Sequence, residues 1–352
     1  MPELTLPDLL AALLVASLNA YVLFGGADFG GGVWDLLASG PRQRRQRELI
    51  SEAISPIWEA NHVWLILAIV LTFTCFPPVF ARLGIVLHIP LTLMLVGIVL
   101  RGSAFTFRSY DSEHDAVQLR WGRIFSVASV VTPLLLGICL GAVAAGRVGG
   151  TLEGGFRERF IDPWWNPFAV SVGFLALALF AFLAAVFLTL ESRDPGLAED
   201  FRRRALASGV AVFLAAGLAL LLSMGGAAPL MRAGLLASPW AIPLHIVTGV
   251  SAIAALAALW YRRYRLARMA AAAQVSLILW GWALSQYPYL LPPGFPIRDS
   301  ASPSATLRLV AIALAIGALV LIPSLFYLFR IFKGAPADGS GSTLGRSDQE
   351  PS

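Results

Sequence analysis

The chain has 352 residues, of which 57% are hydrophobic and only 13% are charged, and its formal net charge at pH 7 is +5. Soluble domains carry about a quarter charged residues, and half that share is too little to solvate a globular surface of this size. The composition therefore excludes a soluble enzyme, a disordered chain and a disulfide-rich secreted domain as descriptions of the whole chain. It predicts an all-α, polytopic membrane protein.

Nine stretches are apolar and long enough to cross a bilayer as helices, which takes about 20 residues each. They cover residues 7–27, 62–81, 84–105, 124–145, 167–190, 205–224, 241–260, 270–287 and 306–329. The connections between them are short, so we predict one transmembrane helical domain over residues 1–333. Residues 334–352 are small and polar, and we predict a disordered cytoplasmic tail there.

Basic residues are unevenly divided between the two sides of this predicted bundle. With the N-terminus placed outside, the odd-numbered connections and the tail hold 19 of the 26 basic residues. The first connection alone carries Arg42, Arg44, Arg45 and Arg47. Because cytoplasmic loops are enriched in Lys and Arg, we expect the N-terminus outside and the C-terminus in the cytoplasm. The basic balance then reflects topology and contact with anionic membrane lipids, and no nucleic-acid partner is expected.

Five glycines in eight residues surround an aspartate where the first span runs toward the cytoplasm. Among them, Gly25, Gly26 and Gly30 are expected to let another helix approach closely. A charged residue at a span centre costs about 2.5–3.5 kcal/mol, so the deeply placed Asp28 is favoured as a functional carboxylate. Asp35 is seven residues further along the same helix face, beside the arginines of the first connection. A hydrated, interfacial position is the simpler interpretation for Asp35.

A second polar cluster opens the next span, with the sequence SPIWEANHVW. Pro56 suits the first turn of a helix, which would place Glu59 near a helix N-terminus where the dipole favours an anion. The flanking Trp58 and Trp64 indicate an interfacial belt or a packed wall. A carboxylate beside indoles in a low dielectric can exchange protons near neutral pH. A solvated glutamate at a helix start is the alternative interpretation.

Two further charged residues adjoin these clusters. Glu52 lies seven residues before Glu59 and extends the same helix face toward the cytoplasm. Arg101 ends the third span on the cytoplasmic side. It either pairs with Glu59 or Asp28, or extends its charged end to the lipid headgroups.

The histidines and cysteines offer little to a metal or a haem. A membrane cytochrome b needs two histidines on facing helices, and His88 with His245 is the pair that such a haem would use. A histidine in a span is more often a hydrogen-bonded core residue. Cys75 and Cys139 fall within spans without a CxxC partner, so we expect them to be packing residues. We therefore expect no metal or cofactor ligated by this chain.

The motifs GGADFG at 25–30 and WEANHVWL at 58–65, taken together, resemble subunit II of the cytochrome bd-type quinol oxidases. That family has a glycine-flanked aspartate on its first helix and a Trp-Asp-Gly-Asn-x-x-Trp-Leu motif opening its second. Weaker similarities follow in order at 76–77, 105–109, 166–168, 287–292 and 322–334. The resemblance covers nearly the whole membrane region.

The sequence departs from the family pattern at two positions, which marks it as a divergent member. The family usually has a second acidic residue three positions before the one matching Asp28, where this chain has Gly25. Glu59 stands in place of the second-helix aspartate, and Ala60 in place of the glycine after it. Glutamate keeps the proton-carrying chemistry. The acidic residue that Gly25 replaces would lie at the cytoplasmic mouth of the family's proton path. Glu52 or Asp35 is the candidate to take its place there.

The resemblance implies two four-helix bundles plus one peripheral helix, in a heterodimer with a haem-bearing subunit I in the prokaryotic cytoplasmic (inner) membrane. That partner would hold haem b, either haem d or only b-type haems, and the quinol site. Subunit II would stabilise it and contribute carboxylates to a cytoplasmic proton path. The residues implied are Asp28, Glu59, Glu52 and Asp35 for the path, Arg101 for charge balance, and Gly25, Gly26, Gly30, Trp58, Asn61 and Trp64 for helix packing. The family also allows a structural quinone, small accessory subunits and bound membrane lipids.

Two other classes of protein are alternatives, of which the second is not favoured by the sequence. A stand-alone ion-coupled transporter would use Asp28 and Glu59 as coupling-ion sites, because intramembrane carboxylates and broken helices occur there too. A catalytic cytochrome b would bind haem on this chain. A transporter purifies without haem, whereas an oxidase subunit II should co-purify with a haem protein.

Overall fold

The computed structural model describes residues 4–110, 115–151 and 153–334. Within the helices, the side chains of residues 55–60, 105, 108–110, 115–119, 322, 325, 326 and 328–334 are outside this description. The chain divides into two compact units, Met1–Pro303 and Ser304–Ser352. Nearly all of the predicted cytoplasmic tail, residues 334–352, lies outside the described residues.

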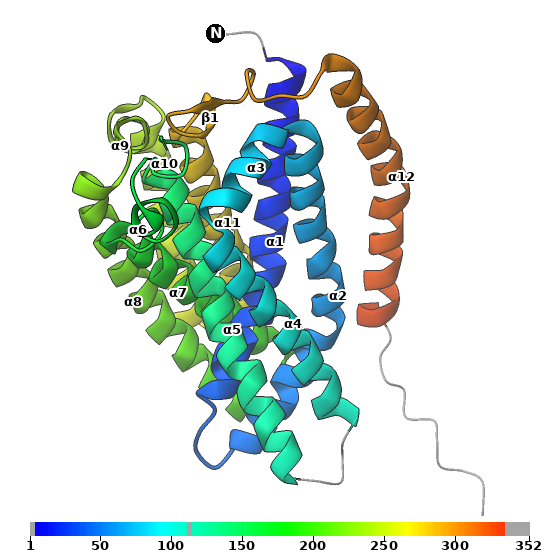
Figure 1. Ribbon diagram of the computed structural model, residues 1–352. Helices are drawn as coiled ribbons and strands as arrows, with labels where there is room; N and C mark the ends of the chain where they lie inside the picture. The colour runs from blue at the N-terminus through cyan, green and yellow to red at the C-terminus, as the bar shows by residue number, and fades with distance from the viewer. Residues whose placement is uncertain (1–3, 111–114, 152, 335–352) are drawn as a thin grey trace, which may run out of the picture. The chain divides into compact units, whose positions relative to one another are not determined.

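Helices make up most of the chain, and Figure 1 labels them in order. The long helices of the first unit are α1 (Leu6–Leu36), α2 (Gln43–Cys75), α4 (His88–Tyr110), α5 (Asp115–Ala144), α7 (Pro167–Glu191), α8 (Pro195–Gly226), α10 (Ala241–Trp260) and α11 (Tyr264–Ser285). Shorter elements are α3 (Pro77–Val86), α6 (Phe156–Phe160), α9 (Pro229–Ala237) and an antiparallel pair, β1 (Tyr289–Leu291) and β2 (Phe295–Pro296). The second unit holds α12 (Ser304–Gly334). The chain is 82% helical, which confirms the all-α prediction.

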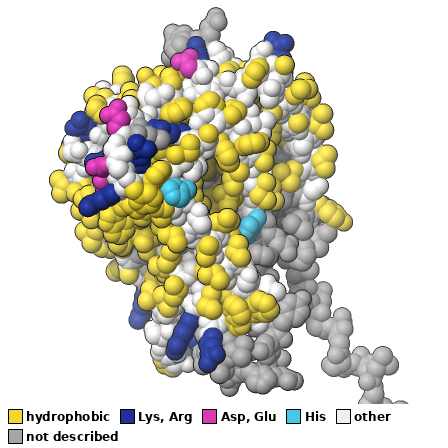
Figure 2. Space-filling view, in the orientation of Figure 1, with side chains coloured by type: hydrophobic (Ala, Val, Ile, Leu, Met, Phe, Trp, Pro, Cys, Tyr) yellow, Lys and Arg dark blue, Asp and Glu magenta, His cyan; other side chains and the backbone are white. Residues whose placement is uncertain are grey.

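Among the described residues, seven helices are long and apolar enough to cross a membrane, and a bent pair formed by α2 and α3 raises the number to eight. The apolar part of α4, His88–Ala104, is shorter than the other candidate spans. The predicted number of nine is therefore approximate. On the face in Figure 2, hydrophobic side chains cover the middle of the helices, and most charged side chains lie toward their ends.

The predicted span 62–81 does not continue as one helix. It breaks at Phe76, and the axes of α2 and α3 differ by 115°. Pro77 at the first position of α3 disfavours a helical conformation for the residue before it, and Phe76 adopts φ −136° and ψ 60°. Ser302 donates from its backbone N–H to the Cys75 carbonyl at 2.8 Å and from its Oγ to the Thr74 carbonyl at 2.7 Å. These bonds satisfy carbonyls that the end of α2 leaves open.

Contacts between connections agree with the predicted division into two sides. Arg42 in the first connection pairs with Asp200 at the start of α8, and Arg262 in the seventh pairs with Glu199. The first, fifth and seventh connections therefore meet at one end of the helices. At the opposite end, Arg82 donates to the Val148 carbonyl at 2.7 Å, which joins the second and fourth connections.

The core of the first unit centres on α7, which packs against α8, α5 and α1. Every residue from 179 to 189 is buried, as expected of a helix that is apolar on all sides. The C-terminal part of α1 is equally enclosed, since residues 28–35 are all buried. The two helices approach closely at Gly30, where a β-carbon would overlap the carbonyl oxygen of Phe180. This approach places the Asp28 region of α1 in the middle of the bundle.

Candidate functional site

A carboxylate and a guanidinium form an ion pair inside the bundle. Arg101 of α4 places its Nη2 2.5 Å from Oδ1 of Asp28 on α1, and its Nη1 3.1 Å from Oδ2. Nη2 also donates to the backbone carbonyl of Asp28 at 3.0 Å. The Asp28 side chain is 0% exposed and that of Arg101 2%. Each charge must compensate the other, because removing one leaves a lone charge in a low dielectric.

The other faces of the Arg101 guanidinium are also in contact. Its Nε donates to Oγ of Ser129 on α5 at 2.9 Å. The ring centroids of Phe29 and Phe125 lie 4.8 and 4.7 Å from its Cζ. A cation near ring faces is attracted by their quadrupoles. Residues of α1, α4 and α5 thus hold the guanidinium in one orientation, and Asp28, one of the two predicted acidic partners, contacts it.

Two buried polar side chains lie near the Asp28 carboxylate. Asn61 of α2 is adjacent to it, and Tyr21 lies two turns earlier on the same face of α1. Among the described residues, neither Asn61 Oδ1 nor the Tyr21 hydroxyl has a hydrogen-bond partner. Buried polar atoms are nearly always paired in native proteins, so these two mark a place that merits a functional explanation.

Asp35 is buried, contrary to the prediction of a hydrated interfacial residue. Its side chain is 4% exposed and accepts a hydrogen bond from Ser126 Oγ of α5 at 2.9 Å. Arg47 lies at the outer side, with its Nε 4.0 Å from Oδ1 and 3.4 Å from the Asp35 carbonyl. The prediction was wrong because α5, ninety-one positions away in the chain, covers this face of α1.

The second predicted cluster lies in the middle of α2 instead of at its start. The helix begins at Gln43, so the prediction that Pro56 opens a helix is wrong. Ile50 and Ile54 pack against Gly31 of α1, and this contact stabilises the preceding turns. Glu52 is exposed. Glu59 and Trp58 belong to the helix, but their side chains lie outside the described residues.

The remaining residues predicted to pack helices lie at contacts of α1 or α2. Gly25 faces the Asn61 amide, where a β-carbon would lie 3.1 Å from Nδ2. A β-carbon at Gly26 would overlap the Leu183 side chain of α7. Trp64 is half-buried against the main core. The glycines thus bring α1 close to both α2 and α7 on either side of Asp28.

The two histidines considered for haem ligation, His88 and His245, lie apart from this cluster. His88 begins α4 and is exposed, with Nδ1 2.9 Å from the Ile85 carbonyl. His245 on α10 has Nδ1 2.6 Å from the Ala241 carbonyl. Since α4 packs mainly on α5, while α10 packs on α11, α8 and α9, these two histidines do not share a helix interface. This placement does not suit ligation of one haem by both.

Sequence reasoning missed the two serines of α5 that connect the aspartates. Ser129 accepts from Arg101 and donates to the Phe125 carbonyl. The single hydroxyl proton of Ser126 is shared between Asp35 and the Gly122 carbonyl, each 2.9 Å from its Oγ. The spacing of three residues between the two serines was the available signal, because it places both on one helix face. Serines in apolar helices commonly bond their own backbone, so that signal was weak.

Comparison with known proteins identifies the family. The profile described as cytochrome bd terminal oxidase subunit II matches residues 6–332. The chain belongs to this family. It is 23% identical over 324 residues to a Bacillus subtilis (strain 168) protein assigned as a cytochrome bd menaquinol oxidase subunit II, covering 89% of this chain and 91% of the relative. It is 25% identical over 182 residues to the Escherichia coli (strain K12) cytochrome bd-I ubiquinol oxidase subunit 2, covering 50% and 46%.

A solved structure supports the same fold. The bd oxidase from Geobacillus thermodenitrificans contains a chain that superposes with a TM-score of 0.78 at 24% identity, covering 94% of this chain and 99% of that one. The resemblance read from the GGADFG and WEANHVWL motifs is confirmed. Subunits of this family are multi-pass components of a haem-containing respiratory oxidoreductase.

Proposed function

We propose that this chain is the non-haem subunit II of a quinol:oxygen oxidoreductase in the prokaryotic cytoplasmic membrane. Its partner is a haem-bearing subunit I, which carries haem b, with or without haem d, and oxidises quinol. The observation that supports a specific role for this chain is the buried Asp28–Arg101 pair, together with the serines that extend from it toward Asp35. In this proposed role, the chain stabilises subunit I and supplies part of a proton path from the cytoplasm.

The proposed path begins at the cytoplasmic end of α1. Asp35 is the penultimate residue of α1 and contacts Arg47 outside and Ser126 inside. One turn further along α5, Ser129 contacts Arg101, and Arg101 contacts Asp28. The two aspartates are seven positions apart in the helix, a rise of about 10 Å. Polar side chains therefore follow one another from the end of the helix to its interior.

The deeper part of the path involves α2. Asn61 lies beside Asp28, with its Oδ1 unpaired among the described residues. Glu59 is two residues earlier in the same helix. We place Glu59 next after Asp28 in proton transfer, with Asn61 as the polar contact between α1 and α2. Glu52, which is exposed, serves at most as a cytoplasmic collector of protons.

Arg101 sets the charge balance of this relay. An ionised carboxylate is costly in an apolar interior, and a nearby guanidinium offsets that cost. The contacts of Arg101 with Ser129 and two rings keep the guanidinium in place independently of Asp28. Its positive charge consequently stays beside the carboxylate throughout proton uptake. A structural quinone and small accessory subunits remain predictions of the family resemblance, and no described contact favours a stand-alone transporter.

Paired substitutions in the intact oxidase complex test the relay. Asp28→Asn and Glu59→Gln each remove a proton-carrying group while keeping a similar shape, and each is expected to lower oxygen-reducing turnover and proton uptake together. The haem absorbance of the complex serves as the control for assembly. Unchanged turnover and unchanged proton uptake in Glu59→Gln would remove Glu59 from the mechanism, and the same result in Asp28→Asn would remove Asp28. Co-purification of a haem protein with this chain separates the oxidase from a transporter.

A further inference from the structure

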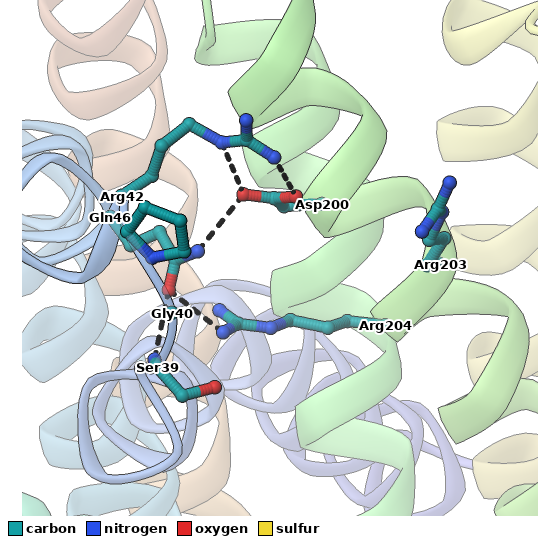
Figure 3. A pocket seen from close by; sticks show the side chains of 8 residues that line it. Ser39, Gly40, Arg42, Gln46, Asp200, Arg203 and Arg204 are labelled. Carbon is teal, nitrogen blue, oxygen red and sulfur yellow. Dashed lines mark hydrogen bonds and ion pairs between the residues drawn. The ribbon is translucent and has the colours of Figure 1, made fainter.

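A basic pocket lies at the end of the helices where the first and fifth connections meet. It is formed by the connection between α1 and α2 and by the first turns of α8 (Figure 3). Three arginines are among the described residues that line it, Arg42, Arg203 and Arg204, together with Asp200. In Figure 3 the Arg42 and Arg204 side chains lie beside Asp200 and Gln46, whereas the Arg203 side chain points away from them. None of these residues belongs to the proton path proposed above.

Asp200, the one acidic residue among the described residues that line the pocket, is already engaged by other lining residues. Arg42 binds both Asp200 oxygens, with Nε 2.9 Å from Oδ2 and Nη2 2.5 Å from Oδ1. Gln46 also donates to Oδ2, at 2.9 Å. The pairing with Asp200 raises the pKa of Arg42 above its usual range. Asp200 thus fixes the position of Arg42 and neutralises only one of the three positive charges.

Arg204 presents a rigid guanidinium to the same pocket. Its Cζ lies 5.4 Å from the ring centroid of Trp34 and 5.2 Å from that of Phe201. Its Nη2 donates to Gln46 Oε1 at 2.8 Å, as Figure 3 shows. Its Nη1 is buried and has no hydrogen-bond partner among the described residues. These contacts hold the guanidinium beside the pocket, and a positive charge fixed there attracts an oxyanion.

Arg203 stands at the outer rim of the pocket and is 77% exposed, with Glu199 3.3 Å away as its ion-pair partner. That glutamate is shared with Arg202 and Arg262, so it does not cancel the charge of Arg203. Further along α8, toward the membrane interior, three exposed apolar residues follow Arg203: Val210, Leu214 and Leu221. We call these three residues the α8 stripe. Counted from Arg203, their spacings of seven, four and seven residues place all of them on one face of the helix.

We propose that this pocket binds the phosphate of an anionic phospholipid of the cytoplasmic leaflet, with its acyl chains lying along the α8 stripe. The proposal rests on the membrane topology of the proposed function. One guanidinium group can donate two parallel hydrogen bonds to the oxygens of a phosphate. Basic pockets between helices on the cytoplasmic side bind anionic lipid headgroups. The α8 stripe favours a lipid over a soluble phosphate, because only a lipid has acyl chains that can lie along these apolar side chains.

The site connects two parts of the chain that are distant in sequence. One wall belongs to the connection after α1 and the other to α8, and Trp34, on which Arg204 stacks, directly precedes Asp35. A phosphate bound by both Arg42 and Arg204 would bridge these two segments. Lipid binding is therefore expected to stabilise the cytoplasmic end of α1.

The test is a lipid titration of the delipidated, detergent-solubilised assembly in which the chain purifies, followed by native mass spectrometry. Phosphatidylglycerol is expected to bind, whereas zwitterionic phosphatidylcholine is not. Arg203→Gln should weaken phosphatidylglycerol binding about fivefold, the effect of one arginine at an anionic surface. Arg44→Gln is the matched control. It removes the same charge from the same face, but Arg44 lies outside the pocket and is 94% exposed.

Three results would overturn the proposal. Equal weakening by Arg203→Gln and Arg44→Gln would show diffuse attraction to the basic face instead of a site. Glycerol phosphate or inorganic phosphate binding as tightly as phosphatidylglycerol would show a site for soluble anions. Unchanged phosphatidylglycerol affinity in Arg203→Gln would show that the lipid binds elsewhere. The readout is lipid affinity and not turnover, so failure of the proton-path proposal leaves this test intact.

Discussion

Arg101 contacts Asp28 through three hydrogen bonds, two to the carboxylate and one to the backbone carbonyl, and both side chains are almost completely buried. The guanidinium therefore recognises the position of the α1 backbone as well as the charge on the side chain. This pair joins α4 to α1 at the depth where the glycines bring α1 close to α7. Its disruption affects both packing and electrostatics, and these two effects can be separated.

Removing Arg101 alone is expected to destabilise the complex more than removing the charges of both Arg101 and Asp28. Arg101→Gln leaves Asp28 as a buried charge without its guanidinium, which costs about 3–5 kcal/mol when a partner of a buried pair is removed. The double variant Asp28→Asn with Arg101→Gln buries no net charge and should recover much of that loss. Thermal unfolding of the purified complex measures both. Equal destabilisation by the single and double variants would contradict a charge-compensating role for Arg101.

The close approach of α1 to α7 predicts intolerance of any side chain at Gly30. A methyl group there would overlap the Phe180 backbone, which cannot rotate away, so Gly30→Ala is expected to cost about 1–3 kcal/mol through overpacking. Gly217→Ala in α8 is the control, because nothing lies within 4 Å of a β-carbon at that position. Alanine has the higher helix propensity, so the control should be neutral or slightly stabilising. Thermal unfolding measures the stability of both variants. Equal melting temperatures for Gly30→Ala and Gly217→Ala would refute the close contact at Gly30.

Much of this arrangement was predictable, and the part that was not depends on contacts between distant segments. Asp28 was identifiable from its glycine-rich setting within an apolar span, and the clustering of the first, fifth and seventh connections follows from their arginines. The burial of Asp35 was not predictable, because it depends on contact with Ser126 of α5. The start of α2 at Gln43 was missed for a related reason, since Ile50 and Ile54 gain their stability from α1. Local patterns indicate apolar spans reliably but do not reveal which face meets which neighbour.

The hydrogen bond from Ser126 to Asp35 gives a prediction about the entrance of the proposed proton path. Ser126→Ala removes a donor to a buried carboxylate, which costs about 1–3 kcal/mol and should slow proton uptake during turnover. Ser126→Thr keeps the hydroxyl and should restore uptake. Ser251→Ala is the control, because that exposed hydroxyl donates only to the Val247 carbonyl among its described contacts. Proton uptake in Ser126→Ala equal to that of the control would exclude Ser126 from the path.

The arginine distribution predicts which end of the bundle faces the cytoplasm, and single cysteines can report it. Arg44 and Arg157 are 94% and 83% exposed and lie in the first and fourth connections, on opposite predicted sides. The native Cys75 and Cys139 are buried, so background reaction with a membrane-impermeant maleimide should be low. In right-side-out vesicles, Arg157→Cys is expected to react and Arg44→Cys to remain protected, and inverted vesicles should reverse the result. Labelling of Arg44→Cys from outside would invert the topology, and with it the direction of proton entry at Asp35 and the leaflet assigned to the phosphate pocket.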